Sequence, residues 1–145
     1  MKSMREGCEF TLPWWLIVII VLETLPMFLG PIVAFNLPGF MGGKGADELN
    51  QATYIYTARN VAVGIALLLA WWLRNAPMLF VLILIRLITD LVDLPTILAF
   101  DLSQNPPLLI GIFMTLYYIP AVIALVYLWQ VVTQQPAKPA ATAPE

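Results

Sequence analysis

Three charged residues, Arg86, Asp90 and Asp93, lie in the stretch IRLITDLVDLP at residues 85–95, inside a long run of Leu, Ile and Val. Their spacing of four and then three residues places them on one face of an α-helix. A carboxyl group can give or take a proton, and an arginine can orient a polar group. This face is therefore suited to acid–base chemistry or to ligand binding. Two further charged residues, Glu23 and Arg59, interrupt other apolar runs.

The cost of burying charge predicts how these five residues pair. A lone charged residue at the centre of a bilayer costs about 2.5–3.5 kcal/mol on insertion scales, so we expect all five to face the protein interior. Matching their depths along the helices predicts two ion pairs, Glu23 with Arg86 and Arg59 with Asp93. Three acids and two bases leave one negative charge. We assign it to Asp90, which would bridge both arginines or carry a proton.

Two uncharged side chains complete the candidate site. Asn60 either extends the charged network or caps a helix end, and Tyr117 or Tyr118 could donate a hydrogen bond or a proton. Neighbouring helical residues face about 100° apart, so Tyr117 and Tyr118 cannot both point straight at the network. The catalytic role is unassigned, and its candidates are Glu23, Asp90 and Asp93. The candidate ligand-binding residues are Arg59, Arg86, Asn60 and Tyr117.

Composition sets the class of protein. Of the 145 residues, 61% are hydrophobic and 11% are charged, which is more apolar than a soluble domain of this size. The net charge of −2 and the lack of a basic patch argue against a nucleic-acid partner. The chain has no histidine and one cysteine, Cys8, so the usual ligands of zinc, haem and iron–sulfur clusters are missing. We therefore expect no metal site and no cofactor.

Four apolar segments are long enough to cross a bilayer, because a span needs about 20 residues at 1.5 Å each. Backbone polar groups must satisfy one another in lipid, so each segment is predicted to be a helix. The expected fold is an all-α integral membrane four-helix bundle over residues 12–132. A segment at 1–11 precedes it, and a Pro/Ala-rich tail at 133–145 is expected to be disordered. The predicted spans are 12–35, 53–73, 77–100 and 108–132.

The connections and the basic residues predict the direction of the spans. Residues 36–51 form a glycine-rich loop, which is a connector or a lid, whereas 74–77 and 101–107 are tight turns. Basic residues favour the cytoplasmic side, and four of the chain's basic residues fall on one side of a four-span topology. Both termini are therefore predicted to be cytoplasmic, with all five tryptophans at the same interface. These four basic residues are Lys2, Arg5, Arg74 and Lys138.

The pattern Arg59-Asn60-x-x-x-Gly64 near the start of the second span, four short helices and acidic residues in the third span resemble the DoxX-like family of small bacterial membrane proteins. The resemblance covers roughly residues 12–132. It implies a four-helix bundle in the bacterial inner membrane, in a family of mostly unassigned function. Some members are thought to be subunits of membrane redox systems that use quinone. This chain departs from the pattern by the number of charges in its third span.

Two hypotheses about function follow. In the first, the protein binds a lipophilic ligand such as a quinone or an isoprenoid, or it is an accessory subunit of a membrane complex or a homo-oligomer. An apolar cavity would give affinity, and Arg59 and Arg86 would orient the polar head of the ligand. In the second, it is an intramembrane acid–base enzyme, of isomerase or cyclase type, acting on a lipophilic substrate. Asp90 or Glu23 would then be the acid and Asp93 the base.

Overall fold

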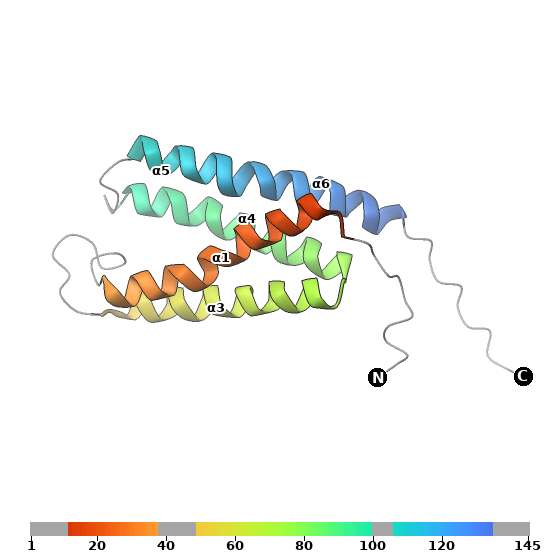
Figure 1. Ribbon diagram of the computed structural model, residues 1–145. Helices are drawn as coiled ribbons and strands as arrows, with labels where there is room; N and C mark the ends of the chain where they lie inside the picture. The colour runs from red at the N-terminus through yellow and green to blue at the C-terminus, as the bar shows by residue number, and fades with distance from the viewer. Residues whose placement is uncertain (1–11, 38–48, 100–105, 135–145) are drawn as a thin grey trace, which may run out of the picture.

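Every element of the protein that the structure describes is helical (Figure 1). The structure is a computed structural model that describes residues 12–37, 49–99 and 106–134. The predicted segment 1–11 lies outside the described residues, as do most of the tail at 133–145, most of the glycine-rich loop and most of the turn at 101–107.

Four helical segments form the fold, as predicted. Each lies close to its predicted span, and the fourth is one continuous helical run of three parts. In chain order the elements are α1 (Trp14–Asn36), α3 (Gln51–Trp72), α4 (Ala76–Ala99), α5 (Pro106–Ile112), η1 (Phe113–Tyr118) and α6 (Ile119–Gln134).

Three of these segments are long and apolar enough to cross a membrane, namely α1, α3 and the run at 106–134. Helix α4 has 24 residues, which is also sufficient length, but it carries Arg86, Asp90 and Asp93. Two of these charged residues, Arg86 and Asp90, are buried, so α4 turns charge toward the interior of the bundle.

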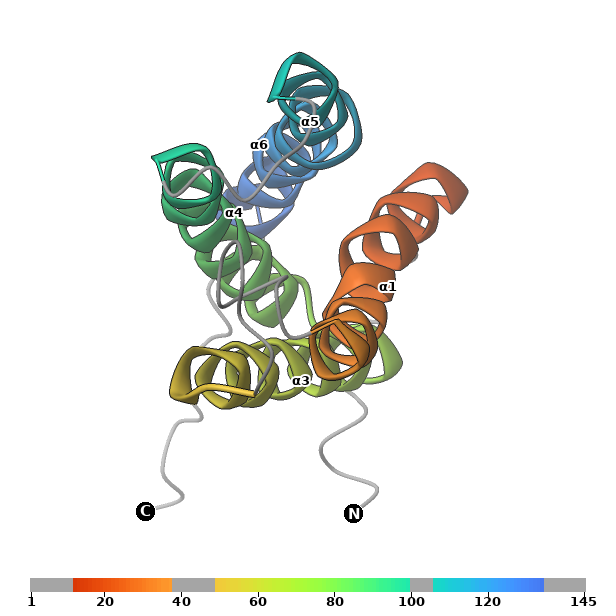
Figure 2. The ribbon, with the colours of Figure 1, turned by 90° about the vertical axis from the view of Figure 1, so that its left-hand side faces the viewer.

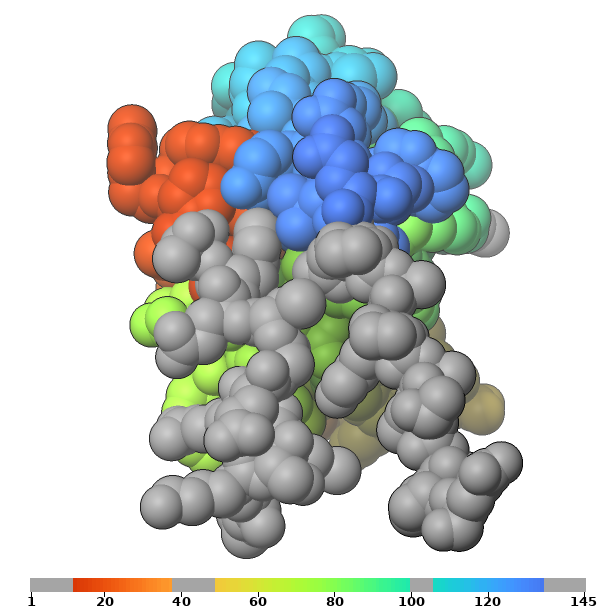
Figure 3. Space-filling model, turned by 90° about the vertical axis from the view of Figure 1, so that its right-hand side faces the viewer, coloured from red at the N-terminus to blue at the C-terminus, as the bar shows by residue number. Residues whose placement is uncertain are grey.

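The helices form a ring in chain order, because α1 packs on α3, α3 on α4, α4 on α6 and α6 on α1. The red start of α1 and the blue end of α6 lie at the same end of the bundle as the α3–α4 turn (Figure 1). At this end α6 lies directly against α1 (Figure 3). At the opposite end the pair α1–α3 separates from the pair α4–α5 (Figures 1 and 2).

Burial divides the bundle into two unlike halves. A purely apolar core fills the half that contains the α3–α4 turn. In the other half α5 has no buried residue, and polar side chains are buried among the helices. The core consists of Leu16, Ile19, Ile20, Leu67, Ala70, Ala76, Leu79, Ile83, Ala121, Ala124 and Leu128. One end is therefore closed by packing, and the other is spread.

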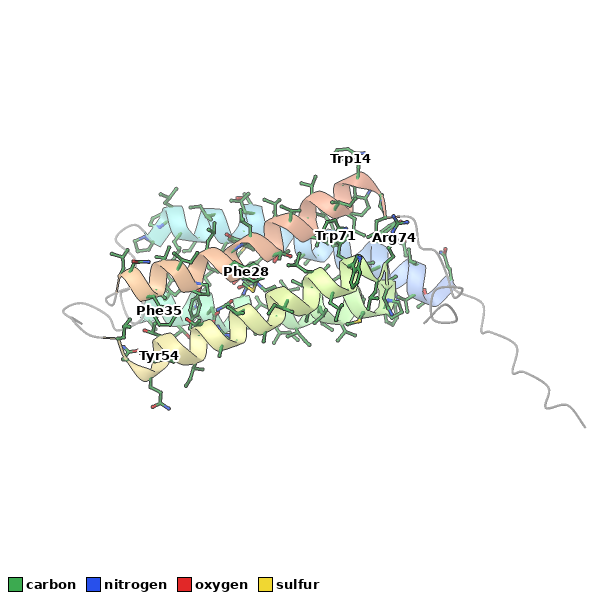
Figure 4. All side chains as sticks on the ribbon, turned by 60° about the horizontal axis from the view of Figure 1, so that its bottom comes forward. Trp14, Phe28, Phe35, Tyr54, Trp71 and Arg74 are labelled. Carbon is green, nitrogen blue, oxygen red and sulfur yellow. The ribbon has the colours of Figure 1, made fainter. Side chains whose placement is uncertain are left out.

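Aromatic residues mark both ends. Trp14 and Trp71 lie with Arg74 at the closed end, and Phe35 and Tyr54 lie at the spread end (Figure 4). The rings of Phe35 and Tyr54 meet edge to face, with centroids 5.7 Å apart, and join α1 to α3. The clustering of Trp14 and Trp71 agrees with the prediction that tryptophans share one end.

The α3–α4 turn is closed by a regular helix-capping motif. The N–H of Asn75 donates to Ala70 O at 3.1 Å, and that of Arg74 donates to Trp71 O at 3.0 Å. This pattern requires a left-handed residue, which is usually glycine, and Arg74 takes that role with φ of 49°. Asn75 then caps α4 by accepting a hydrogen bond from the N–H of Met78 at 3.0 Å.

Arg74→Gly is expected to raise the free energy of unfolding by about 1 kcal/mol, because glycine adopts left-handed backbone without a Cβ clash. Denaturation of the purified protein in mild detergent measures the change. Arg74→Ala keeps the Cβ and serves as the control. Equal stability of the glycine and alanine variants would show that the backbone at residue 74 is not strained.

The wide π-helical turn η1 precedes Pro120. The N–H of Ile119 donates to Met114 O, five residues back rather than four. A proline in an α-helix lacks its N–H and clashes with the carbonyl four residues earlier, so a wider turn just before Pro120 accommodates the ring. The extra residue in this turn also sets which tyrosine of the Tyr117–Tyr118 pair faces the bundle interior.

Candidate functional site

The interior face of α4 carries the more buried of the two short ion pairs of the site. Arg86 Nη1 lies 2.6 Å from Asp90 Oδ1, and the two side chains are 8% and 3% exposed. The residues are four apart on one helix, so the helix itself brings them together. Ile83 and Leu94 are buried on the same face one turn before and after. The pair is therefore both local and dry.

Glu23 of α1 reaches the same place from across the bundle. Its side chain is fully buried, and its Oε2 lies 3.8 Å from Arg86 Nε. That distance is too long for a hydrogen bond. Among the described residues, neither carboxyl oxygen of Glu23 has a hydrogen-bond partner, and Arg86 Nε has none either. We call Glu23, Arg86 and Asp90 the charged cluster.

The predicted ion pair between Glu23 and Arg86 is present at 3.8 Å, and Arg86 forms a second, shorter ion pair with Asp90 at 2.6 Å. Arg86 uses its terminal nitrogen for Asp90 on its own helix and meets Glu23 only through Nε. The reason is geometric. A partner one turn away is held by the backbone, whereas a partner on another helix depends on how closely the helices approach.

A second ion pair joins α3 to α4. Arg59 Nη2 donates to Asp93 Oδ2 at 2.6 Å, which is the predicted pairing. The side chains are 38% and 22% exposed, so this pair lies at the edge of the bundle. The ring of Tyr56 lies under Arg59, 6.0 Å from Cζ, and Tyr56 interacts electrostatically with both ion pairs. Tyr56 thus packs with the second pair, on the same helix as Arg59.

The two uncharged candidates, Asn60 and Tyr117, differ in their surroundings. Asn60 is buried, but its Nδ2 donates to Tyr56 O at 2.8 Å within its own helix. Tyr117 is half-buried, its ring lies 5.4 Å from that of Phe113, and it interacts electrostatically with all three residues of the charged cluster. Of the predicted site residues, Glu23, Arg86 and Asp90 gather in one place, and Tyr117 packs on Phe113. Arg59 and Asp93 form a neighbouring pair.

Of the pair Tyr117 and Tyr118, the tyrosine with the hydrogen bond to α4 is Tyr118, although only Tyr117 stood among the candidate ligand-binding residues. Its hydroxyl donates to the backbone carbonyl oxygen of Asp90 at 2.8 Å, and the residue is 8% exposed. The hydrogen bond ties η1 to α4 at the depth of the charged cluster. The signal that could have found it is Pro120, because a wide turn before a proline rotates the side chains that precede it.

Tyr118→Phe is expected to lower the free energy of unfolding by about 1 kcal/mol, because it removes one buried hydrogen bond and keeps the ring. Tyr117→Phe is the matched control and is expected to change stability less. Denaturation in mild detergent provides the measurement. A larger loss for Tyr117→Phe would reverse the roles assigned to the two tyrosines.

The chemistry available to the site is that of carboxyl, guanidinium and hydroxyl groups. In the described ranges no three His, Cys, Asp or Glu side chains gather in a way that could hold a metal ion. The cluster can accept or donate hydrogen bonds, hold a proton on a carboxyl group and orient a polar group through Arg86.

The chain was compared with protein families, curated proteins and solved structures. No family model, no curated protein and no solved structure matches this chain. The DoxX-like resemblance therefore stays a prediction from the sequence.

Proposed function

We propose that this chain is an integral membrane protein whose charged cluster binds the polar head of a lipophilic molecule. The observation that carries the proposal is the carboxyl group of Glu23, which is fully buried and has no hydrogen-bond partner among the described residues. A buried polar group without a partner costs about 1–3 kcal/mol, and a charged one costs more. A polar group on a ligand would offset that cost.

The shape of the bundle supports the same function. The cluster lies next to the apolar core, because Glu23 follows Ile20 of the core by one turn on α1 and Arg86 follows Ile83 by one turn on α4. The helices there present exposed Leu, Ile, Val and Met side chains, such as Leu29 and Met114. A hydrophobic tail could lie among them while its polar head meets Arg86 and Glu23.

The membrane assignment rests on the three long apolar helices and the overall composition. In the proposed topology both termini are cytoplasmic, because Arg74 lies at the closed end with the tryptophans Trp14 and Trp71. The bacterial inner membrane follows from the DoxX-like resemblance alone. A role as an accessory subunit of a larger membrane complex, or as a homo-oligomer, is the alternative to binding a lipophilic ligand.

Native mass spectrometry of the protein purified in mild detergent, together with its absorbance spectrum, tests the proposal. The wild-type protein is expected to carry an apolar small molecule, and Asp90→Asn is expected to lose most of it, because Asp90 holds Arg86 in place. Thr96→Val is the control, since the Thr96 hydroxyl is exposed and already donates to Val92 O. A wild-type protein without ligand, or unchanged ligand in Asp90→Asn, would contradict the proposal.

An intramembrane acid–base enzyme is a second candidate. The observation that favours it is the unlike setting of two carboxyl groups, since Asp90 is paired with Arg86 at 2.6 Å, whereas Glu23 has no hydrogen-bond partner in the part of the chain that the structure describes. Groups in unlike settings can take separate acid and base roles. This candidate predicts turnover of a lipophilic substrate that is lost in Asp90→Asn.

A further inference from the structure

Arg59 lies toward the outer surface of α3, although its side chain pairs with α4. Ile55, Arg59 and Ala62 are spaced four and then three residues apart, so they form one stripe along the helix, and both Ile55 and Ala62 are exposed. Tyr56 instead turns inward, because a Cβ on Gly30 of α1 would collide with its hydroxyl group. Arg59 therefore stands between the inner side of α3 and the outer surface of the bundle.

The ion pair that Arg59 makes with Asp93 is accessible from outside. The two side chains are 38% and 22% exposed, far more than those of Arg86 and Asp90. The contact uses Nη2 of the guanidinium and Oδ2 of the carboxylate. The other nitrogen atoms of Arg59 and the second oxygen of Asp93 can therefore meet a third group without any opening of the bundle.

In a bilayer, this pair would lie between the mid-plane and the membrane surface at the spread end. Arg59 follows the first residue of α3 by eight residues, and Asp93 precedes the last residue of α4 by six, which is about 12 Å and about 9 Å along the helices. Helical side chains tilt toward the start of their helix, so Arg59 extends toward that surface. Exposed charge at this depth is stabilised when the bilayer thins locally, which brings phospholipid head groups closer.

The charges of the pair define the head group that fits it. Arg59 only donates hydrogen bonds and suits a phosphate oxygen, whereas the Asp93 carboxylate accepts them and suits an ammonium group. The pair is neutral overall, and an anionic head group would meet the negative charge of Asp93. A zwitterion offers both complementary charges. A primary ammonium group can donate to the carboxylate, whereas the trimethylated ammonium of choline has no N–H group to donate.

We propose that the Arg59–Asp93 ion pair is a surface site for a zwitterionic phospholipid with a primary amine, of the phosphatidylethanolamine class. The phosphate accepts from Arg59 and the ammonium group donates to Asp93, while the acyl chains lie on exposed apolar side chains of the same face, such as Ile55. The site is separate from the charged cluster. It shares with the proposed function only the premise that the chain spans a membrane.

Phosphatidylethanolamine and phosphatidylcholine with the same acyl chains are the two probes, because they differ only in methylation of the amine. The full-length protein is released from nanodiscs that hold both lipids at equal mole fraction, and native mass spectrometry counts the retained lipid. Wild type is expected to retain the ethanolamine lipid at least about fivefold better, because hydrogen bonds between charged groups are strong. Equal retention of the two lipids by wild type, a result that depends on no variant, would overturn the inference.

Asp93→Asn tests the two halves of the site separately. The variant keeps the positive charge of Arg59 and removes the carboxylate, so the preference for ethanolamine over choline should fall below about twofold. Anionic phosphatidylglycerol should then be retained in preference to both zwitterionic lipids. Arg74→Gln is the control, since it removes an exposed guanidinium at the closed end and should keep the wild-type preference. An unchanged ethanolamine preference in Asp93→Asn would refute the site.

The same spectra separate this site from the proposed function. An apolar small molecule retained by wild type without any ethanolamine preference would overturn the phospholipid site and leave the proposed function standing. An ethanolamine preference without a retained apolar molecule would support the phospholipid site and contradict the proposed function alone. Retention of no phospholipid by any form would overturn the site and the membrane assignment together.

Discussion

Arg86→Met is expected to lower the free energy of unfolding by about 3–5 kcal/mol, because it leaves the buried carboxyl groups of Glu23 and Asp90 without a counter-charge. The Arg86 and Asp90 side chains are only 8% and 3% exposed, so solvent cannot compensate. Denaturation in mild detergent, followed by the loss of helical circular dichroism, measures the effect. Arg74→Met makes the same change in the exposed α3–α4 turn and is expected to stay within about 0.5 kcal/mol of wild type.

The triple variant Glu23→Gln, Arg86→Met, Asp90→Asn separates the charge effect from packing. It removes all formal charge from the cluster while keeping similar side-chain volumes, and it is expected to recover most of the stability lost in Arg86→Met. A protein that is stable in this form but carries no ligand would show that the charges serve binding. If Arg86→Met alone were as stable as Arg74→Met, the cluster would not be dry.

Gly64→Val is expected to destabilise the bundle by about 1–3 kcal/mol through overpacking between α1 and α3. A Cβ at Gly64 would lie 3.0 Å from Met27 Cβ and 3.0 Å from two ring atoms of Phe28. Phe28 lies between α1 and α3 (Figure 4). Valine adds two further methyl groups at this crossing, so the helices must move apart. Thermal denaturation in detergent measures the loss.

Gly111→Val is the matched control for Gly64→Val. A Cβ at Gly111 meets nothing within 4 Å, so valine there is expected to be neutral or slightly stabilising. Because Glu23 lies one turn before Met27 on α1, Gly64→Val should also weaken ligand retention, which native mass spectrometry can follow. Equal effects of the two substitutions would show that α1 and α3 do not depend on their close approach at Gly64.

The four helices were predictable because their signal is local. Long apolar runs and a proline-containing turn at RNAP define the elements within a few residues. The Arg59–Asp93 pair was also predictable, because matched depth on antiparallel neighbours is enough to bring two charges of opposite sign together.

Details of the charged cluster depend on distances between helices, which the sequence does not encode locally. The sequence places Glu23 level with Arg86, but only the spacing between α1 and α4 decides that they stay 3.8 Å apart and that Asp90 takes the arginine. The sequence also does not show locally that Tyr118, rather than Tyr117, donates the hydrogen bond to Asp90 O. That choice depends on the wide turn before Pro120, which shifts the register of the following helix.

The unlike halves of the bundle have a directional consequence. For a protein that spans a bilayer, the apolar core would lie nearer one leaflet, and the end where the pair α1–α3 separates from the pair α4–α5 would lie nearer the other. Such a protein distinguishes the two faces of the membrane without moving, because the asymmetry is built into where its helices touch.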